Sequence, residues 1–214
     1  MRHLPNILTL SRIPMLFVIV ALLCFPARFG DTAALVLFVA AAVSDWLDGY
    51  IARRVGAVSN FGKLMDALTD KIIMVGLFVA LLGLRWKLPD AYGNSASELE
   101  TLLPQHCVLL VMVIICREFL ITGLRLVAAS NGVVLAAEKA GKIKTALQMI
   151  SVSLLLFAKA LASDWLAAGV PEALPVWARE LGLWTFYAAV VLTIYSGTGY
   201  LVRNRKIFLG DAAR

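Results

Sequence analysis

The sequence is poor in charged residues and has no cysteine pattern. Charged residues make up 16% of the 214 positions, against about 25% in an average soluble domain. The three cysteines, Cys24, Cys107 and Cys116, lie in apolar runs without C-x-x-C spacing, which argues against a disulfide framework or a zinc site. No tandem repeat or low-complexity tract is visible. These absences argue against a soluble globular, repetitive or disulfide-rich protein.

Apolar residues are correspondingly abundant, at 61% of the chain, and the mean hydropathy is +0.84. An excess of this size indicates lipid-facing surface rather than a larger core. We therefore predict an all-α integral membrane bundle that forms a single domain over residues 1–214. Six membrane-spanning helices are expected, at about 7–25, 33–53, 62–84, 102–128, a fifth that follows the basic stretch 136–144 and ends near 162, and 181–201. A short N-terminal interfacial helix could precede the first.

The net charge of +6 is better explained by a membrane than by nucleic acid. Lys and Arg residues adjoin the apolar segments, and no basic stripe with interleaved aromatic residues is present. Six spans place both termini on one side, where most of the basic residues collect. The positive-inside rule then predicts cytoplasmic termini in a bacterial inner membrane, with residues 85–101 and 164–180 as outside loops.

Four carboxylates interrupt the apolar pattern, Asp45, Asp48, Asp66 and Asp70. A helix needs about 20 residues to cross the hydrocarbon, so the second span must continue through the first two. Each pair then shares one helix face, and a short turn brings the two pairs together at the cytoplasmic end. Carboxylates in such proximity repel one another, and hard divalent cations such as Mg²⁺ or Mn²⁺ relieve that repulsion.

The residues between the two pairs suit a phosphorylated ligand beside those cations. Gly49 and Gly62 leave room for close approach to the backbone, Ala52 keeps one face small, and Arg53 can neutralise a phosphate. The alternative to metal binding is a purely structural role. The four aspartates would then be helix caps or ion-pair partners of nearby basic residues, namely Arg53, Arg54, Lys63 and Lys71.

The spacing D-x₂-D-G-x₂-A-R-x₈-G-x₃-D-x₃-D is matched at every fixed position between residues 45 and 70. It resembles the signature of the CDP-alcohol phosphotransferases. The resemblance implies that two divalent ions are bound by Asp45, Asp48, Asp66 and Asp70, with Asp70 also the general base. It further implies a binding site for the CDP-linked donor formed by Asp48, Gly49, Ala52, Arg53 and Gly62.

Three further stretches, residues 5–12, 117–125 and 141–149, resemble the branch of that family that makes phosphatidylglycerophosphate. The resemblance implies transfer of the phosphatidyl group of CDP-diacylglycerol to the 1-hydroxyl of sn-glycerol 3-phosphate, with release of CMP. That reaction is the first committed step of phosphatidylglycerol and cardiolipin synthesis, and the resemblance also implies a homodimer. One departure is Asp66-Ala67-Leu68-Thr69-Asp70, where the branch often has D-P-x-A-D; both carboxylates are kept.

Candidate residues for the acceptor phosphate lie far from the aspartates in sequence: Arg117, Arg125, Lys142 and Lys144. For Arg117 the alternative is an ion pair with Glu118, and for the lysines it is plain positive-inside charge. A different acceptor (serine, inositol phosphate or a phosphobase) and a membrane prenyltransferase are rival enzymes. A cation transporter is the rival from another class, although its acids should lie near the bilayer midplane.

Overall fold

The structure is a computed structural model that describes residues 4–25, 27–55, 60–86, 100–130, 132 and 139–210. Its long helices are α1 (Leu4–Cys24), α2 (Gly30–Val55), α3 (Asn60–Gly83), α4 (Cys107–Ser130), α5 (Lys139–Ala160) and α6 (Ala173–Gly210). A π-helical turn, Leu161–Trp165, and a 3₁₀ turn, Leu166–Ala168, follow α5. Two short strands, β1 (Arg85–Trp86) and β2 (Glu100–Thr101), pair antiparallel. The predicted all-α bundle is confirmed.

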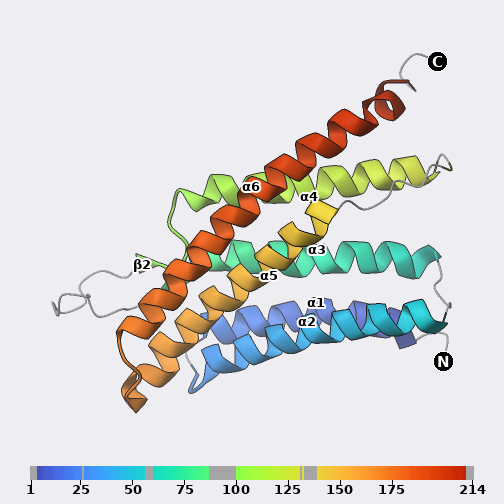
Figure 1. The fold of residues 1–214 in the computed structure, drawn as a ribbon. Helices are drawn as coiled ribbons and strands as arrows, with labels where there is room; N and C mark the ends of the chain where they lie inside the picture. Colours follow the sequence, from blue (N-terminus) through green and yellow to red (C-terminus); the bar gives the residue numbers. More distant parts are fainter. Residues whose placement is uncertain are drawn as a thin grey trace.

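Successive long helices run in opposite directions, as Figure 1 shows. The start of α1, the end of α2, the start of α3, the end of α4, the start of α5 and the end of α6 all lie at one end of the bundle. The strands and the connections between α1 and α2 and between α5 and α6 lie at the other end. The two aspartate-bearing helix ends therefore belong to the same end of the bundle as the start of α1 and the end of α6.

The helix boundaries differ from the sequence-based expectation at several points: α4 begins at Cys107 and not near residue 102, α6 extends to Gly210 and not to about residue 201, and the starts of α1 and α6 also differ. The helix α1 is continuous from Leu4, so the described residues 4–6, which precede the first apolar run, extend that helix and do not form a separate one. The helix α6 begins at Ala173, although residues 173–180 were expected in a loop because of Pro171 and Pro175. Pro175 falls in the first turn of α6, where a missing backbone N–H costs no helical hydrogen bond.

The helices enclose one core to which all six contribute. Phe78 of α3 and Phe186 of α6 are both fully buried, and their ring centroids lie 5.5 Å apart. Small residues allow two helix pairs to approach closely. A Cβ added at Gly76 would lie 2.6 Å from Leu16 Cδ2, and one added at Gly182 would lie 3.0 Å from Leu155 Cγ. The core thus fixes α1 against α3 and α5 against α6.

Three helical stretches of the described residues are long and apolar enough to cross a membrane: Cys107–Ala129, Gly141–Ala168 and Ala173–Arg205. Shorter apolar stretches occupy parts of α1, α2 and α3: Ser11–Cys24, Gly30–Ser44 and Lys71–Gly83. Large apolar side chains face outward, among them Leu109, 74% exposed, and Trp177, 72% exposed. Apolar surface on this scale is expected against lipid. The chain is a membrane protein, and the count of six spans stays a prediction.

Candidate active site

All four aspartates lie on helices, as expected. Asp45 and Asp48 belong to the last part of α2, and Asp66 and Asp70 belong to the first half of α3. Only residues 56–59 separate these two helices, so the two pairs occupy adjoining helix ends. The side chains of the aspartates lie outside the described residues, as do those of the other signature residues, Gly49, Ala52, Arg53 and Gly62. Their convergence and their roles therefore stay predictions.

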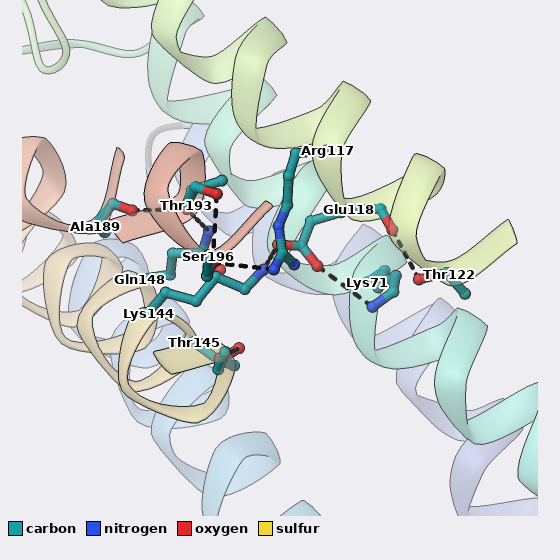
Figure 2. Close-up of polar contacts among 11 residues, drawn as sticks. Lys71, Arg117, Glu118, Thr122, Lys144, Thr145, Gln148, Ala189, Thr193 and Ser196 are labelled. Atoms are coloured by element: carbon teal, nitrogen blue, oxygen red, sulfur yellow. Dashed lines mark hydrogen bonds and ion pairs between the residues drawn. The ribbon is translucent and has the colours of Figure 1, made fainter. Parts of the chain in front are cut away.

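A cluster of charged side chains lies between α3, α4 and α5 (Figure 2), and we call it the cationic cluster. It consists of Lys71 of α3, Arg117 of α4 and Lys144 of α5, which converge on the carboxylate of Glu118. Lys71 Nζ lies 3.3 Å from Glu118 Oε2, and Arg117 Nη1 lies 3.5 Å from Glu118 Oε1. Lys144 forms an ion pair with Glu118 Oε1. Cationic side chains from three helices thus lie around one carboxylate.

Lys144 is the most deeply placed of these cations. Its side chain is only 3% exposed, and that of Glu118 is 12% exposed. Removing an ammonium group from water costs several kcal/mol unless a counter-charge compensates it. The ion pair with Glu118 supplies that compensation within the bundle. Because Lys144 lies near the start of α5, it is located at the same end of the bundle as the aspartates.

A polar strip on α6 and α5 forms the other wall of the cluster. Arg117 Nη2 donates a hydrogen bond to Ser196 Oγ at 3.0 Å, and Ser196 Oγ donates to the Thr193 carbonyl at 3.3 Å. Gln148 Nε2 donates to Thr193 Oγ1 at 3.5 Å. Gln148 lies one helical turn beyond Lys144, so the strip connects the helix of Lys144 with the residue that holds Arg117 (Figure 2).

The cluster is joined to the aspartate helix through Lys71, which directly follows Asp70. With a rise of about 1.5 Å per residue, Lys71 and Asp70 lie at almost the same height on α3. Lys71 and Arg117 also take part in interactions beyond those given above. A phosphate held by the cationic cluster would therefore lie close to the helix that bears the second aspartate pair.

The structure separates the four residues expected to bind the acceptor phosphate. Arg117 and Lys144 meet in the cationic cluster, where Arg117 also makes the ion pair with Glu118 that sequence reasoning had offered as its alternative role. Arg125 and Lys142 are exposed, and among the described side chains no ion pair joins them to the cluster. Lys71 and Ser196 were missed. The only sequence signals were the place of Lys71 after Asp70 and the small pair Ser196-Gly197.

Over the described side chains, no group of three or more His, Cys, Asp or Glu residues lies together. A small pocket of about 20 Å³ lies among α1, α2, α3 and α5, with Arg12 and Thr145 in its polar lining. A larger pocket of about 460 Å³ lies at the opposite end of the bundle, where Asp31 and Lys159 line it. Neither of these two pockets includes a residue of the cationic cluster.

Comparison with known proteins adds information over nearly the whole chain. The sequence pattern of the CDP-alcohol phosphatidyltransferase family matches residues 2–195. The chain is 34% identical to the CDP-diacylglycerol–glycerol-3-phosphate 3-phosphatidyltransferase of Bacillus subtilis, over 95% of this chain and 96% of that protein. It is 30% identical to the Rickettsia typhi protein of the same name, over 97% and 100% of the two chains. A chloroplastic/mitochondrial relative from Arabidopsis thaliana is 33% identical, over 96% of this chain and 64% of its own.

Proposed function

Because the chain belongs to the CDP-alcohol phosphatidyltransferase family, we propose that it transfers the phosphatidyl group of CDP-diacylglycerol to sn-glycerol 3-phosphate. The products are phosphatidylglycerophosphate and CMP. This reaction is the first committed step towards phosphatidylglycerol and cardiolipin. The observation that carries the proposal is the similarity to bacterial relatives that bear the name of this reaction, over at least 95% of the chain. The aspartate signature on α2 and α3 supports the nature of the donor, a CDP-linked lipid.

The cationic cluster supports a phosphorylated acceptor. Guanidinium and ammonium groups are the usual protein ligands of phosphate, and here Arg117 and Lys144 come from different helices to one point. Serine offers only the single charge of a carboxylate next to its own ammonium group, whereas the phosphate of glycerol 3-phosphate has more negative charge and more acceptor oxygens for such a cluster. We assign Arg117 and Lys144, with Lys71, to the phosphate of glycerol 3-phosphate. Arg125 and Lys142, which are exposed to solvent, stay candidates for attracting the anionic acceptor towards the site.

Members of this family generally depend on divalent metal ions, and the donor set at the aspartates fits such ions. Carboxylate oxygens without histidine or thiolate are typical ligands of Mg²⁺ and Mn²⁺. Asp45, Asp48, Asp66 and Asp70 would hold two of them. When bound, the ions would neutralise the diphosphate of the donor. Excess EDTA should therefore reduce CMP release to background, and added Mg²⁺ or Mn²⁺ should restore it; full activity in EDTA would contradict the assignment.

The residues of the chain then act on the acceptor. The cationic cluster holds its phosphate, which directs the 1-hydroxyl towards α3. Asp70 accepts the hydroxyl proton as the oxygen forms a bond to the β-phosphorus of the donor, and the bond from that phosphorus to the CMP oxygen breaks. A positioned base contributes about 10²- to 10⁴-fold to such a step. Arg53 and the small residues Gly49, Ala52 and Gly62 would bind the cytidine diphosphate portion.

We also propose that the end of the bundle with the termini faces the cytoplasm of a bacterial inner membrane, where the water-soluble acceptor is available. The excess of Lys and Arg near that end supports this orientation. In a protein whose three native cysteines are replaced by alanine, a cysteine introduced into the C-terminal tail should react with a membrane-impermeant maleimide only after inside-out vesicles are made. Labelling from the periplasmic side would reverse the orientation. The homodimer implied by the resemblance stays a prediction.

The deciding experiment is an acceptor panel with purified protein in mixed micelles. CMP release from CDP-diacylglycerol is measured with glycerol 3-phosphate, serine, inositol and inositol phosphate. Release with glycerol 3-phosphate alone is expected. Release with another alcohol alone would overturn the acceptor and keep the donor, whereas no release with any alcohol, with Mg²⁺ present and the fold intact, would overturn the donor.

A further inference from the structure

The guanidinium of Arg117 is held from two sides, although its own helix provides only one of them. Nη1 lies 3.5 Å from the carboxylate of Glu118, the next residue on α4. Nη2 donates to Ser196 Oγ on α6 at 3.0 Å. The side chain is only 15% exposed. An arginine fixed by α4 and α6 together can present a defined edge to a phosphate, which a mobile surface arginine cannot do.

The neighbour of Ser196 on α6 makes room for this arrangement. A Cβ added at Gly197 would lie 3.0 Å from Cγ and 3.4 Å from Nε of Arg117. Contact with Cγ at that distance is tighter than ordinary van der Waals packing. The arginine would have to shift, and a shift would lengthen its bond to Ser196 or its contact with Glu118. Gly197 is therefore matched to the arginine and not merely to a neighbouring helix.

Ser196 is itself held in place by its own helix. Its hydroxyl donates to the Thr193 carbonyl at 3.3 Å, which leaves a lone pair directed towards Arg117. The Thr193 hydroxyl donates to the Ala189 carbonyl at 2.6 Å and accepts from Gln148 of α5. The hydrogen bonds that orient Arg117 thus continue to the helix that carries Lys144 (Figure 2).

We propose that Ser196 and Gly197 are positioning residues for acceptor binding: together they hold Arg117 in the orientation that receives the phosphate of glycerol 3-phosphate. The proposal rests on the acceptor role given to Arg117 above. It adds a specific function to α6, a helix outside the aspartate signature. In this arrangement Ser196 supplies the hydrogen bond, and Gly197 supplies the space.

Three glycines on α6 provide a matched experiment. Gly197 faces Arg117, Gly182 packs against the apolar side chain of Leu155, and Gly199 has no atom within 4 Å of an added Cβ. Each is changed to alanine, and CMP release is measured against glycerol 3-phosphate and, separately, against CDP-diacylglycerol. Thermal unfolding in detergent is followed in parallel, because an alanine in a helix is intrinsically more stable than a glycine.

Gly197→Ala should raise the KM for glycerol 3-phosphate roughly threefold to tenfold, because the arginine must shift by a few tenths of an ångström, less than the misplacement of about 1 Å that can cost about a hundredfold. Its KM for CDP-diacylglycerol and its kcat at saturating acceptor should stay near wild type. Gly182→Ala should lower the unfolding temperature without that KM change, and Gly199→Ala should leave the KM unchanged and raise the unfolding temperature slightly. A Gly197→Ala protein that only unfolds earlier, with an unchanged acceptor KM, would overturn the proposal.

Ser196 gives a second, independent readout. Ser196→Ala should raise the acceptor KM roughly threefold to tenfold, the effect of a typical intramolecular hydrogen bond, because Arg117 keeps its contact with Glu118. Ser196→Thr, which keeps the hydroxyl, should restore the KM. Arg117→Ala separates this proposal from the function it rests on. If Arg117→Ala leaves the acceptor KM unchanged, the acceptor role of Arg117 fails. If Arg117→Ala raises it and neither α6 variant does, only the positioning role fails.

The double variant Arg117→Ala with Gly197→Ala completes the cycle. Because the added methyl group then meets no arginine, the double variant should have the acceptor KM of Arg117→Ala alone. Effects that multiply would mean that Gly197 acts through another part of the protein, which would contradict the proposal.

Discussion

Two groups of buried charges lie about 22 Å apart along α5, by the helical rise between Lys144 and Lys159. Around Lys144, three described cations meet the single carboxylate of Glu118. Around Lys159, one cation meets one carboxylate, with Lys159 Nζ 2.5 Å from Asp31 Oδ1. The same helix therefore carries a lysine of each kind, one in a cluster of cations and one in a balanced pair.

The polar groups near the pair of Lys159 and Asp31 also form hydrogen bonds with one another. Asp164 accepts hydrogen bonds from the backbone N–H of Thr32 at 2.8 Å and from its hydroxyl at 2.7 Å. Trp165 Nε1 donates to the same hydroxyl at 3.0 Å. These contacts connect the start of α2 to the π-helical turn after α5. Groups that satisfy one another in this way stabilise the fold, whereas cations gathered from three helices are suited to a bound anion.

The largest effect on turnover is expected at the aspartates. Asp70→Asn should reduce CMP release by about 10²- to 10⁴-fold, the contribution of a positioned base, while the unfolding temperature stays near that of the wild type. Asp164→Asn is the matched control at the other end of the bundle and should retain activity within about twofold, because an amide oxygen can still accept from Thr32. Normal turnover in Asp70→Asn would remove the assignment of the base.

The next largest effect is expected at Lys144. Lys144→Met keeps the length of the side chain and removes its charge, and Glu118 retains Lys71 and Arg117 as partners. The KM for glycerol 3-phosphate should rise about 10- to 100-fold, the effect of losing one hydrogen bond to a charged group. The KM for CDP-diacylglycerol should not change. Equal increases in the KM for both substrates would mean that Lys144 maintains the structure of the whole site and does not bind the acceptor specifically.

A smaller effect is expected where cations are exposed. Arg125 and Lys142 lie outside the cationic cluster and are open to solvent, so water and salt screen their interaction with an approaching phosphate. Arg125→Ala and Lys142→Ala should each lower kcat/KM for glycerol 3-phosphate about twofold to fivefold, since an exposed ion pair contributes about 0.2–1 kcal/mol. The effect should fade as salt is raised. An effect at either position as large as that of Lys144→Met, persisting in salt, would add that residue to the cluster.

The placement of the aspartates could be predicted from the sequence because it depends on length alone. An apolar stretch that ends at Val43 is too short to span a membrane, so α2 had to continue through Asp45 and Asp48, and it does. The start of α6 could not be placed in the same way. Pro175 ends a helix in most contexts, but it is also favoured in a first turn, and local sequence does not distinguish these two uses.

The cationic cluster depends on contacts between distant parts of the chain, which a single sequence does not contain. Arg117 and Glu118 are neighbours, so their ion pair was foreseeable. The approach of Lys71 and Lys144 to the same carboxylate follows from how α3, α4 and α5 pack. The hydrogen bond from Arg117 to Ser196, and the space that Gly197 leaves for the arginine, likewise require α6 to cross α4 at the level of Arg117. Residue type alone could not separate Lys144 from the exposed Lys142.

The smallest effect on turnover, and the sharpest check on the contrast between the two lysines, is expected at Lys159. Lys159→Met repeats the Lys144 substitution on the same helix, and the acceptor KM should stay within about twofold of wild type. Its effect should instead be on stability. Asp31 would stay buried without its counter-charge, which costs about 3–5 kcal/mol in comparable pairs. The lower part of that range is expected, because the pair lines a pocket of about 460 Å³.

Adding Asp31→Asn to Lys159→Met removes the stranded charge, so the double variant should regain at least half of the lost stability. Thermal unfolding in detergent measures this recovery, and CMP release in the same preparation measures the acceptor KM. If Lys159→Met raised the acceptor KM as much as Lys144→Met does, phosphate binding would not be confined to the cationic cluster. The different surroundings of the two lysines would then give no reason to assign the acceptor phosphate to Lys144.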